Sequence, residues 1–229
     1  MGKLVEDVSL RDKNDVFMDR SQAGHLLALQ LSKYKGTDSI ILAIPSGGVP
    51  VASEIREALG LPMDLIIVRK VQIPGNTEAG FGAMGSDGEI ILNEGLLQRI
   101  GLTEEETAMQ IKKTLNVIRK RERLFRAGKP FPSIKDRNAI IVDDGLASGY
   151  TMLAAINIVK SKDPRKIIIA VPTASRNTAD FILPEVDELV CLNVRSGYPF
   201  AVADAYVNWY DVPDEEVLEI LKKDNKKTS

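Results

Sequence analysis

The sequence predicts an α/β fold built on a mostly parallel, twisted sheet with helices on both faces. The first observation is that short apolar runs alternate along the chain with segments of helical spacing. A strand that helices cover on both faces is apolar along its whole length, as these runs are. The second is size, because 229 residues with 44% hydrophobic content can bury a good core within one domain. We expect a single domain over residues 1–229, with its core at about residues 20–194.

The expected helices have recognisable ends. Residues 21–35 show helical spacing of apolar side chains and stop at Gly36. Thr103 and the three glutamates after it form a capping box, which begins a long helix ending near residue 126. Pro213 stands at the first position of a last helix to about residue 223, whose acidic first turn suits the helix dipole. Further helices are expected at 49–59, in the second half of 139–160 and near 178–183.

Apolar runs predict the strands between those helices. They lie at 39–44, at 64–69, at the start of 139–160, at 166–171 and at 188–194. Residues 71–92 differ, because five glycines alternate there with short apolar pieces. That pattern predicts a mobile loop or a hairpin, ending in a short strand at 89–92. With the long helix that follows, it forms a helical insertion over about residues 71–128.

Ligands of parallel α/β sheets bind beyond the carboxyl ends of the strands. Several loops should therefore meet in one cleft, namely those after Ile44, Arg69, Asp144 and Val171. This expectation depends on the parallel sheet alone.

The most informative segment is residues 140–152, with the sequence IIVDDGLASGYTM. Three β-branched apolar residues precede two adjacent carboxylates, Asp143 and Asp144, and a turn of small and hydroxyl residues then opens a helix. The free N–H groups and positive dipole end of that helix suit a phosphate, and the carboxylates suit sugar hydroxyls and a metal. The segment predicts a site for a phosphorylated sugar. A core strand with a solvated acidic turn is the alternative, but it does not explain why Ser148, Gly149 and Thr151 lie together.

Two further segments carry features of an anion site. In the segment IPSGGVPVA, residues 44–52, the paired Gly47 and Gly48 let backbone amides approach an anion closely. A tight turn without a ligand is the alternative there. Arg69 and Lys70 place two cations where an apolar strand is expected to end, and such cations neutralise a diphosphate.

The segment 140–152 resembles the phosphoribosyl-diphosphate (PRPP) binding signature of the type I phosphoribosyltransferases. Its form there is an apolar strand, Asp-Asp or Glu-Asp, and a small-residue loop ending Thr-Gly-x-Thr. This chain departs from it at Ser148, where Thr is usual, and at Tyr150, where Ala or Gly is commoner. Part of the family has Pro-Arg-Gly-Gly in the other loop, where this chain has Ser46. Residues 74–83 resemble the corresponding segment of a less characterised subgroup.

The resemblance implies transfer of the 5-phosphoribosyl group of PRPP to a nitrogenous base, with release of pyrophosphate and with Mg²⁺ as cofactor. It implies that the catalytic residues are Asp143, Asp144, Arg69 and Lys70, and that the two aspartates hold the metal through water. The PRPP-binding residues that it implies are Ser46, Gly47, Gly48, Arg69, Lys70, Asp143, Asp144, Gly145, Leu146, Ala147, Ser148, Gly149, Tyr150 and Thr151. It also implies a small hood over the base, built from the N- and C-terminal segments.

A PRPP-binding regulatory protein without transferase activity is the alternative function. Ser46 favours it slightly, because the usual cation is missing there. The complete Asp143-Asp144 pair and the Arg69-Lys70 element argue against it. No motif in the sequence selects among purines, pyrimidines and other nitrogen heterocycles as the acceptor base.

Composition argues against several other classes. A net charge of −2 gives no general attraction to nucleic acid, and no apolar run approaches the roughly 20 residues of a membrane span. Cys191 is the one cysteine and His25 the one histidine, which excludes an internal disulfide and argues against a Ser-His-Asp triad and a multi-histidine metal site. We expect a cytoplasmic homodimer whose partners are PRPP and a small heterocyclic base, without membrane or nucleic-acid partners.

Two groups of side chains remain open. The basic second half of the helix at 103–126 is a solvated face favoured by the helix dipole or part of a dimer interface. The aromatic residues Tyr206, Trp209 and Tyr210 pack a small core or stack on the base.

Overall fold

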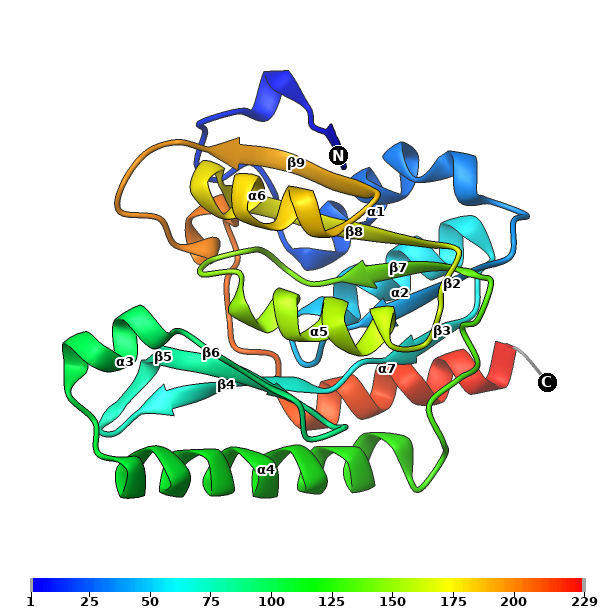
Figure 1. Ribbon diagram of the computed structural model, residues 1–229. Helices are drawn as coiled ribbons and strands as arrows, with labels where there is room; N and C mark the ends of the chain where they lie inside the picture. Colours follow the sequence, from blue (N-terminus) through cyan, green and yellow to red (C-terminus); the bar gives the residue numbers. More distant parts are fainter. Residues whose placement is uncertain (1, 228–229) are drawn as a thin grey trace.

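The computed structural model describes residues 2–227, the side chains of 77, 78 and 224–227 excepted (Figure 1). Within this range, six strands form one sheet in the order β1-β9-β8-β7-β2-β3, and every neighbouring pair is parallel. The predicted fold class is therefore confirmed. The strands are β1 (Lys3–Val5), β2 (Ser39–Ala43), β3 (Met63–Leu65), β7 (Asn138–Val142), β8 (Lys166–Ser175) and β9 (Glu188–Arg195).

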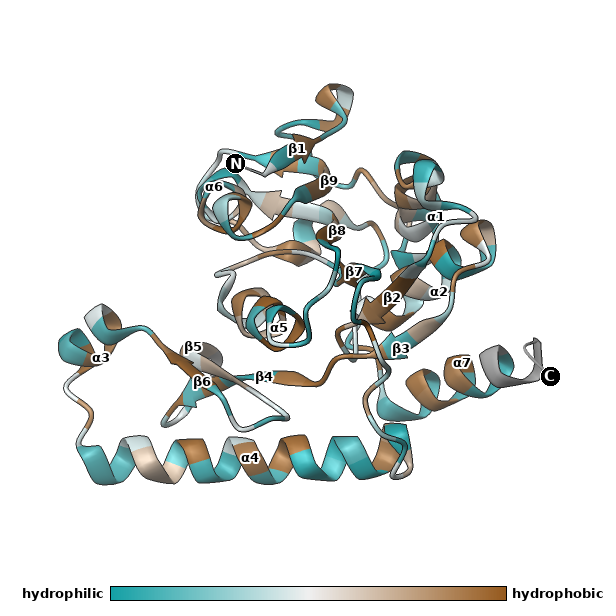
Figure 2. Ribbon diagram, turned by 45° about the vertical axis from the view of Figure 1, so that its right-hand side comes forward, coloured by the Kyte–Doolittle hydropathy of each residue, from teal (hydrophilic) through white to brown (hydrophobic). Residues whose placement is uncertain are grey.

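Helices cover both faces of this sheet because its strands are apolar on both sides. In β2, Ile41 packs into a core with α1 (Arg20–Gln30) and α2 (Gly48–Leu59). Its neighbours Ile40 and Leu42 pack into a second core with α5 (Tyr150–Lys160) and α6 (Arg176–Ile182). Successive side chains of a strand point to opposite faces, so one apolar run supplies both cores. Figure 2 shows β2 as hydrophobic over most of its length.

The expected strand at 64–69 is wrong, because the apolar run there divides between two sheets. The strand β3 ends at Leu65 in the parallel sheet, and β4 (Val68–Ile73) begins an antiparallel sheet with β5 (Asn76–Gly85) and β6 (Ile90–Leu92). Ile66 and Ile67 join the two strands and are 1% and 2% exposed. Because the connection is as deeply buried as the strands, the apolar pattern does not reveal the break.

A mobile loop and a hairpin were the two alternatives expected for the glycine-rich segment 71–92, and the structure shows the hairpin. It lies between α5 and the long helix α4 (Glu104–Arg126) (Figure 1). A Cβ atom at Gly82 would lie 2.5 Å from the carbonyl oxygen of Ile91. At Gly85 a Cβ would overlap the side chain of Ile158 in α5. These glycines therefore permit close packing on both sides of β5.

Three features of the termini and the insertion differ from the sequence expectations or refine them. The short strand β1 pairs with β9, so the parallel sheet extends beyond the core expected at 20–194. The helix α3 (Glu94–Ile100) precedes α4, whose capping box at Thr103 is confirmed. The last helix, α7 (Asp214–Lys227), begins directly after Pro213. Among the described residues, none of the helices combines the length and the apolar character that a membrane crossing requires.

The irregular segments carry short 3-10 turns. They are η1 (Val8–Leu10), η2 (Ser32–Tyr34), η3 (Leu183–Glu185) and η4 (Val202–Ala205). The last of them leads into the segment 206–212, whose end borders the pocket described next.

Candidate active site

A pocket of about 540 Å³ lies beyond the carboxyl ends of β2 and β7. The loop after β2, the start of β4, the two carboxylates after β7 and the first turn of α5 all contribute to it. Its lining residues are Ile44, Pro45, Ser46, Gly47, Val68, Arg69, Lys70, Gln72, Arg121, Asp143, Asp144, Thr151, Asp211 and Val212. The loops expected after Ile44 and Asp144 meet there, whereas Arg69 reaches the pocket from within β4 and no loop follows it. The loop after Val171 does not exist, because β8 continues to Ser175.

Of the PRPP-binding residues implied by the family, half line this pocket. They are Ser46, Gly47, Arg69, Lys70, Asp143, Asp144 and Thr151. The others lie beneath it or around the start of α5: Gly48 is buried, Leu146 is buried in the core, and Ala147 and Ser148 are exposed. Gly145, Gly149 and Tyr150 complete this second group.

The two carboxylates after β7 have different surroundings. Asp143 accepts a hydrogen bond through Oδ1 from the backbone N–H of Asp144, at 2.9 Å. Burial and the adjacent charge of Asp144 raise the pKa of Asp143 well above its ordinary value. Burial also raises the pKa of Asp144, and the guanidinium of Arg20 opposes that rise. Of the two carboxylates, Asp144 is therefore the one whose charge is paired within the protein.

Arg20 is a site residue that the sequence analysis missed. Its Nε and Nη2 atoms both lie 2.9 Å from Oδ2 of Asp144, and its side chain is 5% exposed. Nη1 donates to the carbonyl oxygen of Tyr210 at 2.9 Å. The sequence holds one signal for Arg20, which is its position. Asp19 caps α1 and Arg20 is the first residue of that helix, where the helix dipole disfavours a cation.

The aromatic residues before α7 hold Arg20 and Asp144 in place. Tyr206 is buried against Phe17, with ring centroids 5.6 Å apart, and donates its hydroxyl to the carbonyl oxygen of Asp144 at 2.6 Å. The guanidinium of Arg20 lies 4.0 Å from the ring centroid of Trp209, within the range of a cation–π contact. Tyr206 and Trp209 therefore pack against each other, with ring centroids 5.3 Å apart, and stacking of the exposed Trp209 or Tyr210 on a base stays a prediction.

Gly47 and Gly48 allow the loop after β2 to lie directly against β7. A Cβ at Gly47 would overlap the carboxylate of Asp144, and one at Gly48 would lie 2.6 Å from the carbonyl oxygen of Val142. The peptide bond between Pro45 and Ser46 is cis. Both glycines are therefore required for the packing that brings the loop to the carboxylates.

We expect Gly48→Ala to lower the melting temperature by several degrees, since its methyl group meets backbone that cannot move aside. A loss of about 1 kcal/mol shifts the midpoint by roughly 2–4 °C in a domain of this size. Gly197→Ala is the matched control, because no atom beyond its two chain neighbours lies within 4 Å of the Cβ that it would add. Thermal unfolding of both variants checks the expectation, and equal midpoints would contradict it.

The start of α5 presents backbone N–H groups that no side chain caps. Gly149 occupies the N-cap position with φ of +82°, and no side-chain hydrogen bond is made there. A Cβ on Gly149 would also lie 2.8 Å from the side chain of Thr178. The ring of Tyr150 lies 5.9 Å from that of Phe181 in α6, which explains a bulky residue at this position. Such a helix start suits a phosphate.

The cations of the pocket come from two elements, β4 and α4. Arg69 and Lys70 lie at the beginning of β4 rather than at the end of a strand of the parallel sheet. Arg121 reaches the pocket from α4, so the basic half of that helix is not uniformly a solvated face. Burial, together with the nearby charge of Arg121, lowers the pKa of Arg69.

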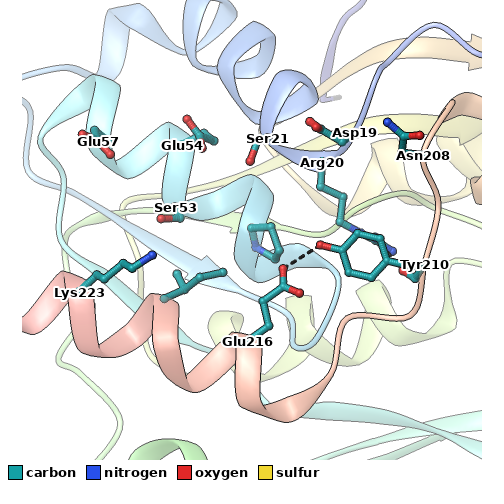
Figure 3. Close-up of a pocket in the computed structure, with 12 residues that line it drawn as sticks. Asp19, Arg20, Ser21, Ser53, Glu54, Glu57, Asn208, Tyr210, Glu216 and Lys223 are labelled. Atoms are coloured by element: carbon teal, nitrogen blue, oxygen red, sulfur yellow. Dashed lines mark hydrogen bonds between the residues drawn. The ribbon is translucent and has the colours of Figure 1, made fainter.

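A second pocket, of about 640 Å³, lies between α1, α2, α7 and the segment at 208–210 (Figure 3). The acidic side chains of Glu54 and Glu57 border it from α2, and the hydroxyl of Tyr210 donates to Glu216 at 2.9 Å. Arg20 also borders it. The side chain of Arg20 therefore links this pocket to Asp144 of the first one.

The donor set fits a magnesium ion that is bound together with phosphates. Mg²⁺ is usually held by one or two carboxylates, several waters and the oxygens of a substrate. Asp143 and Asp144 supply two carboxylates at the pocket wall. Across the described residues no three His, Cys, Asp or Glu side chains are grouped to enclose a metal ion by themselves, so the phosphates of a substrate would complete the coordination.

Comparisons with known proteins agree on the class of domain. The family described as "Phosphoribosyl transferase domain" matches residues 20–204. A crystal structure of the Thermus thermophilus protein TT1426 is similar, with a TM-score of 0.72 and 36% identity, covering 90% of this chain and 98% of that one. Proteins from two Mycobacterium tuberculosis strains, which are provisionally named phosphoribosyl transferases, are 34% identical over 208 residues. The match covers 91% of this chain and 47% of theirs, so the chain spans about half their length.

Proposed function

The chain belongs to the phosphoribosyl transferase domain family, and on that premise we propose that it transfers the 5-phosphoribosyl group of PRPP to a nitrogenous base and releases pyrophosphate. The observation that supports this most is the meeting of three chemistries in one pocket. Two carboxylates that suit ribose hydroxyls, Thr151 in the uncapped first turn of α5, which suits a phosphate, and a cluster of cations that suits a diphosphate all line this pocket. PRPP carries these same groups.

We assign each part of PRPP to a part of the pocket. Asp143 and Asp144 accept hydrogen bonds from the two ribose hydroxyls. The loop from Gly145 to Thr151 binds the 5′-phosphate through backbone N–H groups at the start of α5. The remaining residues of the implied set surround the pyrophosphate, and they are Ser46, Gly47, Gly48, Arg69 and Lys70.

These residues would position PRPP and neutralise the negative charge of the leaving pyrophosphate. Displacement of pyrophosphate from C1 of the ribose passes through a transition state with oxocarbenium character, so the charge that leaves with the pyrophosphate must be stabilised. Arg69 and Lys70 act on the leaving oxygens. A bound Mg²⁺ would add charge neutralisation at the phosphates, with Asp143 and Asp144 holding it through water. No strong base is required, and none of the pocket-lining residues is a histidine.

A PRPP-binding regulator without transferase activity is the second candidate, and Ser46 is the observation that favours it. We also propose that residues 1–229 form a single domain and that the protein is a cytoplasmic homodimer without membrane or nucleic-acid partners. Sedimentation of the purified chain tests the oligomeric state.

A panel of purine, pyrimidine and other nitrogen heterocycles tests the proposed reaction. We expect PRPP-dependent release of pyrophosphate in the presence of Mg²⁺ with at least one of these bases. The double variant Asp143→Asn/Asp144→Asn is the control and should release none. PRPP binding without release from any base would favour the regulator, and no PRPP binding at all would contradict both candidates.

A further inference from the structure

The side chain of Arg121 leaves the long helix α4 and reaches the loop after β2. Its Nη1 atom donates to the carbonyl oxygen of Pro45 at 3.3 Å, and its Nη2 atom donates to Oγ of Ser46 at 3.2 Å. Residues 121 and 46 are 75 positions apart in the sequence. The helical insertion therefore delivers a guanidinium to a loop of the pocket whose own side chains are uncharged.

Arg121 forms an ion pair with one carboxylate and lies near a second guanidinium, that of Arg69. Nη2 of Arg121 lies 3.1 Å from Oδ1 of Asp214 at the start of α7, and the two side chains are 15% and 36% exposed. Arg69 lies near enough for the charge of Arg121 to lower its pKa. Two guanidinium groups thus share one carboxylate at a partly buried site. Like charges in such a site are unfavourable, and a diphosphate would offset the cost.

Resting on the proposed function, we infer that Arg121 is a pyrophosphate-binding residue, which supplies from α4 the cation that position 46 lacks. Part of the family carries an arginine in the loop at the position of Ser46. In this chain the guanidinium occupies the same neighbourhood, but it comes from another element. A planar guanidinium can donate two parallel hydrogen bonds to phosphate oxygens.

A purely structural role for Arg121 would have a different signature. Its three contacts join α4 to the loop and to α7, so removing them would lower stability without changing the preference among ligands. Pyrophosphate and ribose 5-phosphate separate the two roles, because ribose 5-phosphate lacks the group that Arg121 would bind.

Calorimetric titration of the full chain with Mg²⁺-pyrophosphate and with ribose 5-phosphate tests the inference. The variants are Arg121→Gln, Arg121→Lys and the control Arg119→Gln, an exposed arginine of the same helix. We expect Arg121→Gln to weaken pyrophosphate binding about 10- to 100-fold, the loss expected for charge-assisted hydrogen bonds. Binding of ribose 5-phosphate should stay within about twofold. Arg121→Lys should lose less pyrophosphate affinity than Arg121→Gln, and Arg119→Gln should match the wild type.

The outcomes distinguish this inference from the proposed function. If wild type binds pyrophosphate and PRPP while Arg121→Gln binds pyrophosphate as tightly as Arg119→Gln does, the inference is overturned and the proposed function stands. If both ligands weaken equally in Arg121→Gln and Arg121→Lys, Arg121 is structural. If wild type binds neither PRPP nor pyrophosphate, the proposed function itself fails. Thermal unfolding verifies that each variant is folded; should Arg121→Gln not fold, the comparison of Arg121→Lys with wild type decides.

Discussion

Replacing Arg20 by methionine should destabilise the protein by about 3–5 kcal/mol, because it leaves the Asp144 carboxylate without its charged partner. The substitution also removes the hydrogen bond to the Tyr210 carbonyl and the stacking on Trp209. At roughly 2–4 °C for each kcal/mol, the melting temperature should fall by about 10 °C. Thermal unfolding measures it.

A double variant separates the lost charge pair from lost packing. In Arg20→Met/Asp144→Asn the side chain at 144 is neutral and needs no cation, so much of the lost stability should return. If the double variant is as unstable as Arg20→Met alone, the lost ion pair is not the cause, and the lost contacts with Tyr210 and Trp209 are.

Asp143→Asn should have the opposite effect on stability while it impairs function. Burial and the charge of Asp144 raise the pKa of Asp143, so its ionised form destabilises the folded state at neutral pH. Asparagine keeps the acceptor for the Asp144 N–H and carries no charge. We expect a melting temperature above that of wild type near pH 8, by roughly 2–4 °C for each kcal/mol recovered. We also expect loss of PRPP-dependent pyrophosphate release.

The pH dependence of this difference has a definite sign. A carboxyl group whose pKa is raised on folding contributes stability that is present below its unfolded pKa, about 3.9, and that is lost as pH rises through the folded pKa. The gap between Asp143→Asn and wild type should therefore be wide near pH 8 and narrow toward pH 4. A gap that widens on acidification would show that Asp143 is not a destabilising charge in the folded protein.

Most strands of the parallel sheet could be predicted from the sequence, because burial on both faces requires apolar side chains. A strand such as 138–142 is buried on both faces, and such a strand must be apolar throughout. The strand prediction failed at residues 64–69, where Ile66 and Ile67 are buried in a connection between two sheets. It also missed β1, since three residues at a sheet edge form too short a pattern to recognise.

The candidate site was predictable where the chemistry follows directly after a strand. Asp143 and Asp144, and the loop of Gly47 and Gly48, are placed by the ends of β7 and β2. Arg20 and Arg121 were not predictable in this way. Each extends from a helix, Arg20 to the carboxylate of Asp144 and Arg121 to the pocket, and only the rotation of the helix decides what the side chain reaches. Arg121 is one of several cations in α4. The helix dipole favours cations in the second half of a helix, so nothing in the sequence distinguishes Arg121 from the others.

Thermal unfolding of the wild-type chain with increasing PRPP and Mg²⁺ tests most directly that this pocket binds PRPP. At a PRPP concentration about 100 times its dissociation constant, binding should add about 2.7 kcal/mol of stability. We expect a rise in melting temperature that grows with PRPP concentration and is absent in Asp143→Asn/Asp144→Asn. An unchanged melting temperature of wild type at millimolar PRPP, or an equal rise in the double variant, would contradict PRPP as the ligand of this pocket.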